Sequence, residues 1–112
     1  MTDKTSKDSS DILERLFAVI VSRKGADTSS SYTAKLFEAG TAEIARKVGE
    51  EAVETIIAAL SVPDNIAAES ADLLYHLMVL WAEAGVKPED VLAELKKREG
   101  TSGLEEKNQR GS

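Results

Sequence analysis

The chain has 112 residues, 42% of them hydrophobic but only 4% aromatic, so one domain with a mainly aliphatic core is expected. Its 20 acidic against 14 basic residues give a net charge of -6, which argues against nucleic acid as a partner. There is no cysteine, no apolar stretch long enough for a bilayer and no apolar segment in the polar start, so we expect a cytoplasmic protein that does not bind membranes.

The N-terminal part of the chain predicts a disordered polar segment, residues 1–10, followed by a helix over residues 11–23. Asp11 followed by Glu14 resembles a capping box at the start of this helix. The helical spacing is carried by Ile12, Leu16, Val19 and Ile20. A strand over the β-branched run 19–21 is the less favoured interpretation, because its flanks are helical in pattern.

A loop rich in glycine, threonine and serine, residues 25–31, separates this helix from the next one. Its serines are either hydroxyl donors for phosphate groups or simply flexible linker residues. Tyr32 to Ala39 then forms a short predicted helix, which Gly40 is expected to end in the left-handed conformation.

A long helix is predicted from the N-cap Thr41 to about Leu60. On a helical wheel of about 100° per residue, Glu51 and Glu54 lie at the edge of its apolar stripe. The members of that stripe, all predicted to be buried, are Ile44, Val48, Ala52, Ile56 and Ala59 or Leu60, with Val53 and Ile57 alongside.

Pro63 ends the long helix, and Ser61 or Asp64 is predicted to cap the next one, which runs to about Ala84. This helix is apolar nearly all round from Leu73 to Trp81, so it needs cover on every side. One small subunit offers too little surface for that, and the sequence therefore predicts a homodimer.

The last predicted helix starts at Pro88 and reaches Glu99, after a break at Gly85. The predicted organisation is one all-α domain over residues 11–99, a bundle of about four to five helices, followed by a C-terminal tail over residues 100–112.

Two acidic pairs, Glu51 with Glu54 and Glu69 with Asp72, stand in segments that otherwise predict apolar-faced helices. Residues three apart on a helix share a face, with β-carbons about 5–6 Å apart, so like charges there repel. An antiparallel helical hairpin brings two such pairs face to face. A hard divalent cation, Mg²⁺ above all and Mn²⁺ as a possible substitute, supplies the counter-charge, and Mg²⁺ sites are typical of phosphate chemistry.

The alternative interpretation of these carboxylates is ordinary solvated charge, with Arg46–Glu50 and Lys47–Glu51 as surface ion pairs. His76, one turn after Asp72, is either a core residue with a hydrogen-bond partner or a contact of Asp72 or of the substrate. A zinc site is excluded by one histidine and no cysteine, and a P-loop by the lack of its glycine-rich Lys-Ser/Thr motif.

Four stretches of the chain match the motifs of a known family: Ser31-Tyr-Thr-Ala-Lys-Leu36, Lys47-Val-Gly-Glu-Glu-Ala-Val-Glu54, Glu69-Ser-Ala-Asp-Leu-Leu-Tyr-His-Leu77 and Ser102-Gly-Leu-Glu-Glu-Lys107. Together they resemble the phosphoribosyl-ATP pyrophosphatases of histidine biosynthesis, within the MazG-like all-α NTP pyrophosphohydrolase superfamily. The acidic motifs are shared across that superfamily, while the Ser-Tyr-Thr segment and the tail motif single out the family.

The resemblance implies Mg²⁺-dependent hydrolysis of the α–β phosphoanhydride of phosphoribosyl-ATP to phosphoribosyl-AMP and pyrophosphate, by a homodimer. Glu51, Glu54, Glu69 and Asp72 are then the expected metal ligands, and Glu50 is the candidate base for the attacking water. The remaining candidates for the substrate are Lys47, His76, Arg98, Lys107 and Arg110, the last two reaching from the tail into the partner's pocket.

Two other functions remain open at the level of the sequence. One is the same chemistry on another nucleotide, as in housecleaning NTP or dUTP pyrophosphatases, against which the tail motif argues. The other is a non-catalytic helical interaction module, against which the presence of all the expected metal ligands argues.

Overall fold

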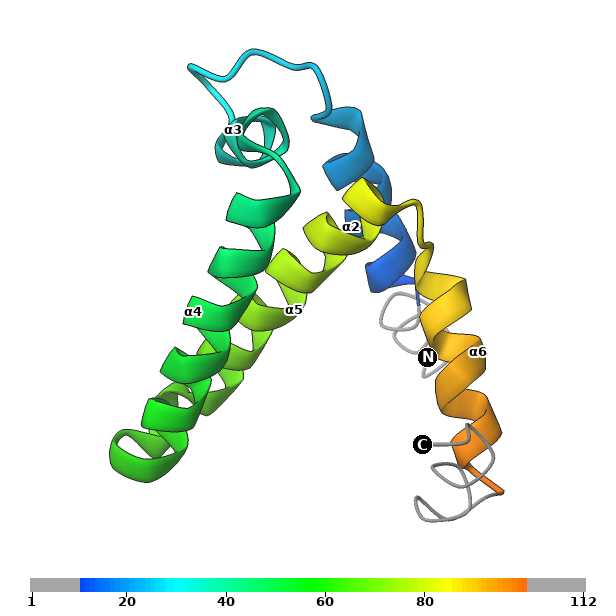
Figure 1. Cartoon of the computed structure of the whole chain (residues 1–112). Helices are drawn as coiled ribbons and strands as arrows, with labels where there is room; N and C mark the ends of the chain where they lie inside the picture. Colours follow the sequence, from blue (N-terminus) through cyan, green and yellow to red (C-terminus); the bar gives the residue numbers. More distant parts are fainter. Residues whose placement is uncertain (1–10, 101–112) are drawn as a thin grey trace, which may run out of the picture.

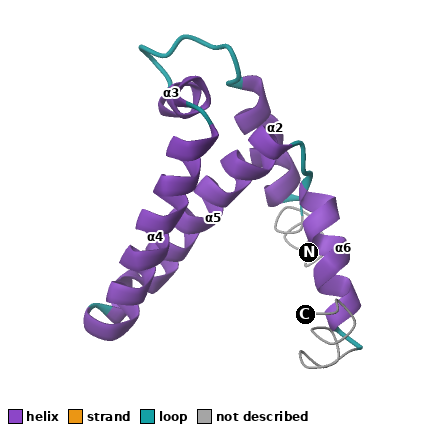
Figure 2. Ribbon diagram, viewed as in Figure 1, coloured by secondary structure: helices purple, strands orange, loops and turns teal. Residues whose placement is uncertain are grey.

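Helices account for all the regular secondary structure in the part of the chain that the structure describes. The computed structural model describes residues 11–100 and has no strand there (Figure 2). The elements are α2 (Ile12–Ser22), α3 (Tyr32–Ala39), α4 (Thr41–Ser61), the 3₁₀ turn η1 (Pro63–Asn65), α5 (Ile66–Ala84) and α6 (Pro88–Arg98). The predicted all-α class is confirmed, whereas the predictions for residues 1–10 and for the tail beyond residue 100 lie outside the described residues.

The two longest helices, α4 and α5, lie side by side and antiparallel, joined by η1 at one end of the pair (Figure 1). We call the end around η1, residues 53–66, the hairpin tip. At the opposite end, here the core end, α5 contacts α2 and α3, and α6 packs against α2. Among the described helices, none combines the length and the apolar character that crossing a membrane requires.

The hydrophobic core lies at the core end of the pair. Its most buried large side chains are Ile20 of α2, Ile44 of α4, and Met78 and Val79 of α5, all 0–1% exposed. The chain itself therefore covers much of the apolar part of α5. This cover comes from the loop 23–31 and the turn at Gly40, which bring α2 and α3 back against α5. It is not complete, since Leu74 is 37% exposed, and the need of this segment for a second subunit stays a prediction.

The apolar residues of α4 fall on two opposite faces rather than on one stripe. The inner face, against α5, has Ile44, Glu51 and Ala58 as its buried members. The predicted stripe is wrong in its second half, since Val53, Ile56, Ile57 and Leu60 are 53–80% exposed. At about 100° per residue these outer residues centre close to 180° from Glu51. Glu51 thus lies in the middle of the buried face and not at its edge.

Three predicted helix caps do not form as expected. Asp11 occupies the N-cap of α2 without a side-chain capping bond. Thr41 is already helical, and its hydroxyl instead donates to Glu83 at 2.9 Å, so Gly40 is the N-cap of α4. The N-cap of α5 is Asn65 rather than Ser61 or Asp64, because η1 carries those residues out of capping position.

Ser31 and Gly40 fix the start and the end of α3. Gly40 has the expected positive φ of 99°, but its ψ of 178° is extended rather than left-handed helical, so α4 starts at the next residue. Ser31 caps the N-terminus, its hydroxyl accepting from the backbone N–H of Ala34 at 3.0 Å. The short helix is thereby held with Tyr32 and Thr33 facing α5, to which both are hydrogen-bonded.

Candidate metal centre

Carboxylates from α4 and α5 converge midway along the helix pair. Oxygen atoms of Glu51, Glu69 and Asp72 all lie within 4.8 Å of one another, and those of Glu50, Glu51 and Glu54 form a second such group. Glu51 belongs to both groups. The expected meeting of the two acidic motifs across a helical hairpin is therefore what the structure has, with Glu51 at its centre.

Thr55 joins the backbones of the two helices beside the carboxylates. Its hydroxyl oxygen lies 2.8 Å from the carbonyl oxygen of Glu51 and 3.2 Å from that of Glu69. One hydroxyl proton is thus shared between the acidic turn of α4 and that of α5. This contact helps to hold the register in which the two acidic motifs face each other.

Glu51 is the buried member of the cluster, with 7% of its surface exposed, while Glu69 is half-buried and Glu54 and Asp72 are exposed. Burial, followed by repulsion from Glu54, raises the pKa of the Glu51 carboxyl, and Asp72 adds to the rise. The solvated-charge interpretation therefore fails for Glu51. A buried carboxylate among like charges gains stability from a cation held between them.

Glu50 is on the solvent side of the cluster and is paired with two cations. Lys47 Nζ lies 3.0 Å from one carboxylate oxygen, and the Arg46 guanidinium donates to the other. Hydrogen bonds from Lys47 and then Arg46 lower the pKa of Glu50. Lys47 Nζ is also 3.9 Å from Glu51, so both predicted i,i+4 pairs are present, and Lys47 bridges the two carboxylates.

His76 is buried beside the cluster and uses both ring nitrogens. Nδ1 lies 2.8 Å from the backbone carbonyl oxygen of Asp72, and Nε2 lies 3.0 Å from the hydroxyl of Tyr32. Both interpretations of this histidine therefore hold in part: it is a core residue with satisfied hydrogen bonds, and it contacts the turn that carries Asp72.

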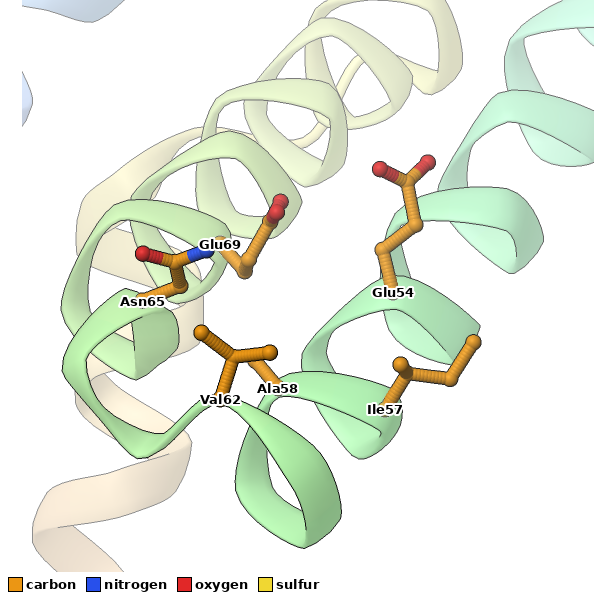
Figure 3. A pocket seen from close by; sticks show the side chains of 6 residues that line it. All are labelled: Glu54, Ile57, Ala58, Val62, Asn65 and Glu69. Atoms are coloured by element: carbon orange, nitrogen blue, oxygen red, sulfur yellow. The ribbon is translucent and has the colours of Figure 1, made fainter.

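A hollow of about 180 Å³ opens next to the cluster on the side of the hairpin tip (Figure 3). Glu54 of α4 and Glu69 of α5 stand on opposite sides of its mouth, with their carboxylates directed away from the tip. The rest of its lining is apolar except for one amide, and consists of Ile57, Ala58, Val62 and Asn65. The carboxylates thus border a mainly apolar depression, and not only open solvent.

One predicted substrate contact, Arg98, is not part of this cluster. Arg98 is at the C-terminal end of α6, which lies beside α2 and away from α4 in Figure 1. Lys107 and Arg110 lie outside the described residues. Conversely, Thr55 and Asn65 were not singled out from the sequence, because a single threonine or asparagine in a helical pattern carries no chemical signal of its own.

Comparison with known proteins gives one consistent result. A family model described as phosphoribosyl-ATP pyrophosphohydrolase matches residues 13–99. The phosphoribosyl-ATP pyrophosphatase of Azospirillum brasilense is 61% identical over 107 residues, 95% of this chain and 96% of the relative. Those of Paramagnetospirillum magneticum and Rhodospirillum rubrum are 61% and 58% identical, over 90% and 87% of this chain and 94% and 84% of the relatives.

Proposed function

The chain belongs to the phosphoribosyl-ATP pyrophosphohydrolase family, and on that premise we propose that it hydrolyses the α–β phosphoanhydride of phosphoribosyl-ATP to phosphoribosyl-AMP and pyrophosphate. The observation that carries the proposal is the convergence of Glu51, Glu69 and Asp72 in a chain so similar to these relatives. The proposed compartment is the cytoplasm, which suits an enzyme of nucleotide chemistry and a chain without cysteine.

The donor set fits a hard divalent cation, and we propose Mg²⁺, with Mn²⁺ as a substitute. All its members are carboxylates, and they gather around a buried Glu51 whose neighbours repel it. Glu51, Glu69 and Asp72 are the proposed ligands, with Glu54 joining from the neighbouring group. When bound, the ion supplies neutralisation of the negative charge that the triphosphate brings to an acidic site.

Lys47 and Glu50 are the proposed catalytic side chains. In the structure each oxygen of the Glu50 carboxylate accepts from a cation, which makes it a poor proton acceptor as it stands. A phosphate group of the substrate competes with Glu50 for the Lys47 ammonium. Lys47 then binds the phosphate, and the released Glu50 oxygen accepts the proton of the attacking water.

The exposed outer face of α4 is the proposed site of homodimer formation. Val53, Ile56 and Leu60 repeat at helical spacing on the side opposite the acidic cluster's centre, and all three are exposed within the described chain. A second copy of the same face is the simplest cover, since a two-fold pair buries one stripe against another. Arg98, Lys107 and Arg110 remain proposed phosphate contacts.

Hydrolysis of phosphoribosyl-ATP, followed by chromatography of the products, tests the proposal. We expect stoichiometric phosphoribosyl-AMP and pyrophosphate with Mg²⁺, and no turnover in excess EDTA. Hydrolysis in ¹⁸O-labelled water shows which phosphorus is attacked, because the label appears in the product that carries it. Turnover of dUTP or common NTPs in place of phosphoribosyl-ATP would contradict the proposed substrate, and unchanged turnover in EDTA would contradict the metal site.

A further inference from the structure

Tyr32 is an aromatic side chain next to the acidic cluster that the proposed chemistry leaves without a role. It belongs to the Ser-Tyr-Thr segment that begins α3, and 50% of its surface is exposed. Its hydroxyl is nevertheless held in place, 3.0 Å from Nε2 of the buried His76. An aromatic ring that is half open to solvent and has a fixed hydroxyl is suited to meet a ligand.

The hydrogen bonds of His76 determine what the Tyr32 hydroxyl can offer. The carbonyl oxygen of Asp72 can only accept, so the imidazole donates to it from Nδ1–H. Nε2 lies 3.0 Å from the hydroxyl of Tyr32 and fixes the position of the hydroxyl oxygen. That oxygen has two lone pairs and uses at most one of them in this contact, so at least one stays available to accept a hydrogen bond from a ligand.

The position of this acceptor is fixed relative to the acidic turn of α5. His76 connects the Tyr32 hydroxyl to the backbone of Asp72, a member of the carboxylate cluster. Along the helix pair, Tyr32 and the hollow lined by Asn65 lie on opposite sides of that cluster, because α3 packs at the core end and Asn65 belongs to the hairpin tip. A substrate bound at the carboxylates therefore has Tyr32 on the side away from the hollow.

We propose that Tyr32 is a substrate-binding residue whose hydroxyl oxygen accepts a hydrogen bond from a ribose hydroxyl of the nucleotide. The inference rests on the proposed function for the identity of that nucleotide. Ribose hydroxyls carry a proton to donate and ionised phosphate oxygens do not, so of the sugar and the phosphates only the ribose offers a proton to this acceptor. Within the protein, the Lys47 ammonium does not occupy this acceptor, because its hydrogen bond goes to Glu50.

The neighbouring pair Thr33–Tyr75 provides a matched control. The hydroxyls of Thr33 and Tyr75 lie 2.5 Å apart and also join α3 to α5. Tyr32→Phe and Tyr75→Phe thus make the same chemical change and each remove one α3–α5 hydrogen bond. If Tyr32 only ties the two helices together, the two variants behave alike. Only a ligand contact sets them apart in KM.

Steady-state kinetics of the purified, Mg²⁺-loaded full chain test the inference. For Tyr32→Phe we expect KM for phosphoribosyl-ATP to rise by roughly 3- to 10-fold with kcat little changed, the usual effect of losing one neutral hydrogen bond to a ligand. For Tyr75→Phe we expect an unchanged KM. Its melting temperature should fall by about as much as that of Tyr32→Phe, because each variant loses one α3–α5 hydrogen bond. Equal KM values for Tyr32→Phe and the unmodified protein would overturn the inference, as would equal rises in both variants.

A second arm separates a direct contact from an effect through Lys47. In a Lys47→Met background, the fold-change in KM caused by Tyr32→Phe persists if Tyr32 touches the substrate, and disappears if Tyr32 only orients Lys47. Disappearance counts against the inference. The proposed function is tested separately by the unmodified protein: if that protein turns over a different ribonucleotide, the same KM ratios are measured with it, because the ribose hydroxyl is common to both.

Discussion

The two ends of the α4–α5 pair differ in how many other helices cover them. At the core end, Ile44 and Val79 are completely buried, because α2 and α3 lie against the pair. At the hairpin tip, Ile56 is 58% and Leu60 80% exposed, although these side chains are as apolar as those of the core. Similar apolar side chains are thus buried at one end and exposed at the other, and the further helices at the core end account for the difference.

The acidic cluster lies where that cover stops. Glu51 is buried by the helix pair itself, while Asp72 and Glu54 on either side of it reach solvent. This placement gives one carboxylate a low-dielectric environment and leaves the others accessible to an ion and a substrate. The boundary between the two ends therefore gives the proposed metal site both rigid support and access.

The largest effect is expected for activity at that boundary. Asp72→Asn keeps the size of the side chain and removes one charge from the cluster, so we expect kcat/KM to fall by roughly 100-fold or more, as is usual when a charged group of a metal-phosphate site is lost. Asp64→Asn, an exposed carboxylate of η1 outside the cluster, is the control and should retain its activity. Near-normal turnover by Asp72→Asn would show that the cluster is not the site.

The next largest effect is expected for stability at the core end. Met78 is 1% exposed, and Met78→Ala should lower the free energy of unfolding by about 2–5 kcal/mol, the usual cost of a large-to-small change in a core. The loss should be the same at every protein concentration, because the cavity lies within one chain. Thermal or urea unfolding at two concentrations measures it, and a cost below about 1 kcal/mol would place Met78 outside the core.

At the hairpin tip the expected effect is on assembly rather than on the fold of the chain. Leu60→Lys places a charge on the outer face of α4, where it costs the single chain little but prevents two such faces from packing together. We expect light scattering to change from a dimer to a 12.0 kDa monomer, with helical content retained. A dimer of unchanged stability in this variant would exclude the outer face as the interface.

The smallest effect is expected from Glu51→Gln in protein freed of metal with EDTA. The pKa of Glu51 is raised in the folded chain, so the folded state holds the proton more tightly than the unfolded state does, and stability falls as pH rises from the ordinary value near 4.5. At pH 7, which is above that ordinary value, the carboxyl group therefore lowers the stability of the folded chain. Gln removes this loss, and we expect the melting temperature to rise by roughly 2–5 °C.

The rise in melting temperature expected for Glu51→Gln depends on pH and on bound metal. Below the ordinary carboxyl pKa, Glu51 is protonated in both states, so the difference between the two proteins should vanish there. Adding Mg²⁺ at pH 7 should raise the melting temperature of the unmodified protein more than that of Glu51→Gln, since a ligand of the folded state stabilises it. A variant that melts lower than the unmodified protein at pH 7 would contradict the origin of the raised pKa.

The positions of the helices and the identity of the acidic motifs could be predicted from the sequence, because both depend on local spacing. Apolar residues at period 3.6, together with Gly40, Pro63 and Pro88 as breaks, fix the helices. Two carboxylates three residues apart share a helix face whatever the rest of the chain does, so the pairs 51/54 and 69/72 can be predicted without any long-range contact.

Only the tertiary structure decided which face of α4 is buried, since this helix has apolar side chains on two opposite faces and its sequence fits either choice. Packing against α5 selects the face with Ile44 and Ala58 and thereby puts Glu51 at its centre. The Tyr32–His76 contact likewise joins residues 44 apart in the chain, which no local pattern can predict. Spacing thus determined which chemical groups the site has, and long-range packing determined which of them are buried, paired or open to a substrate.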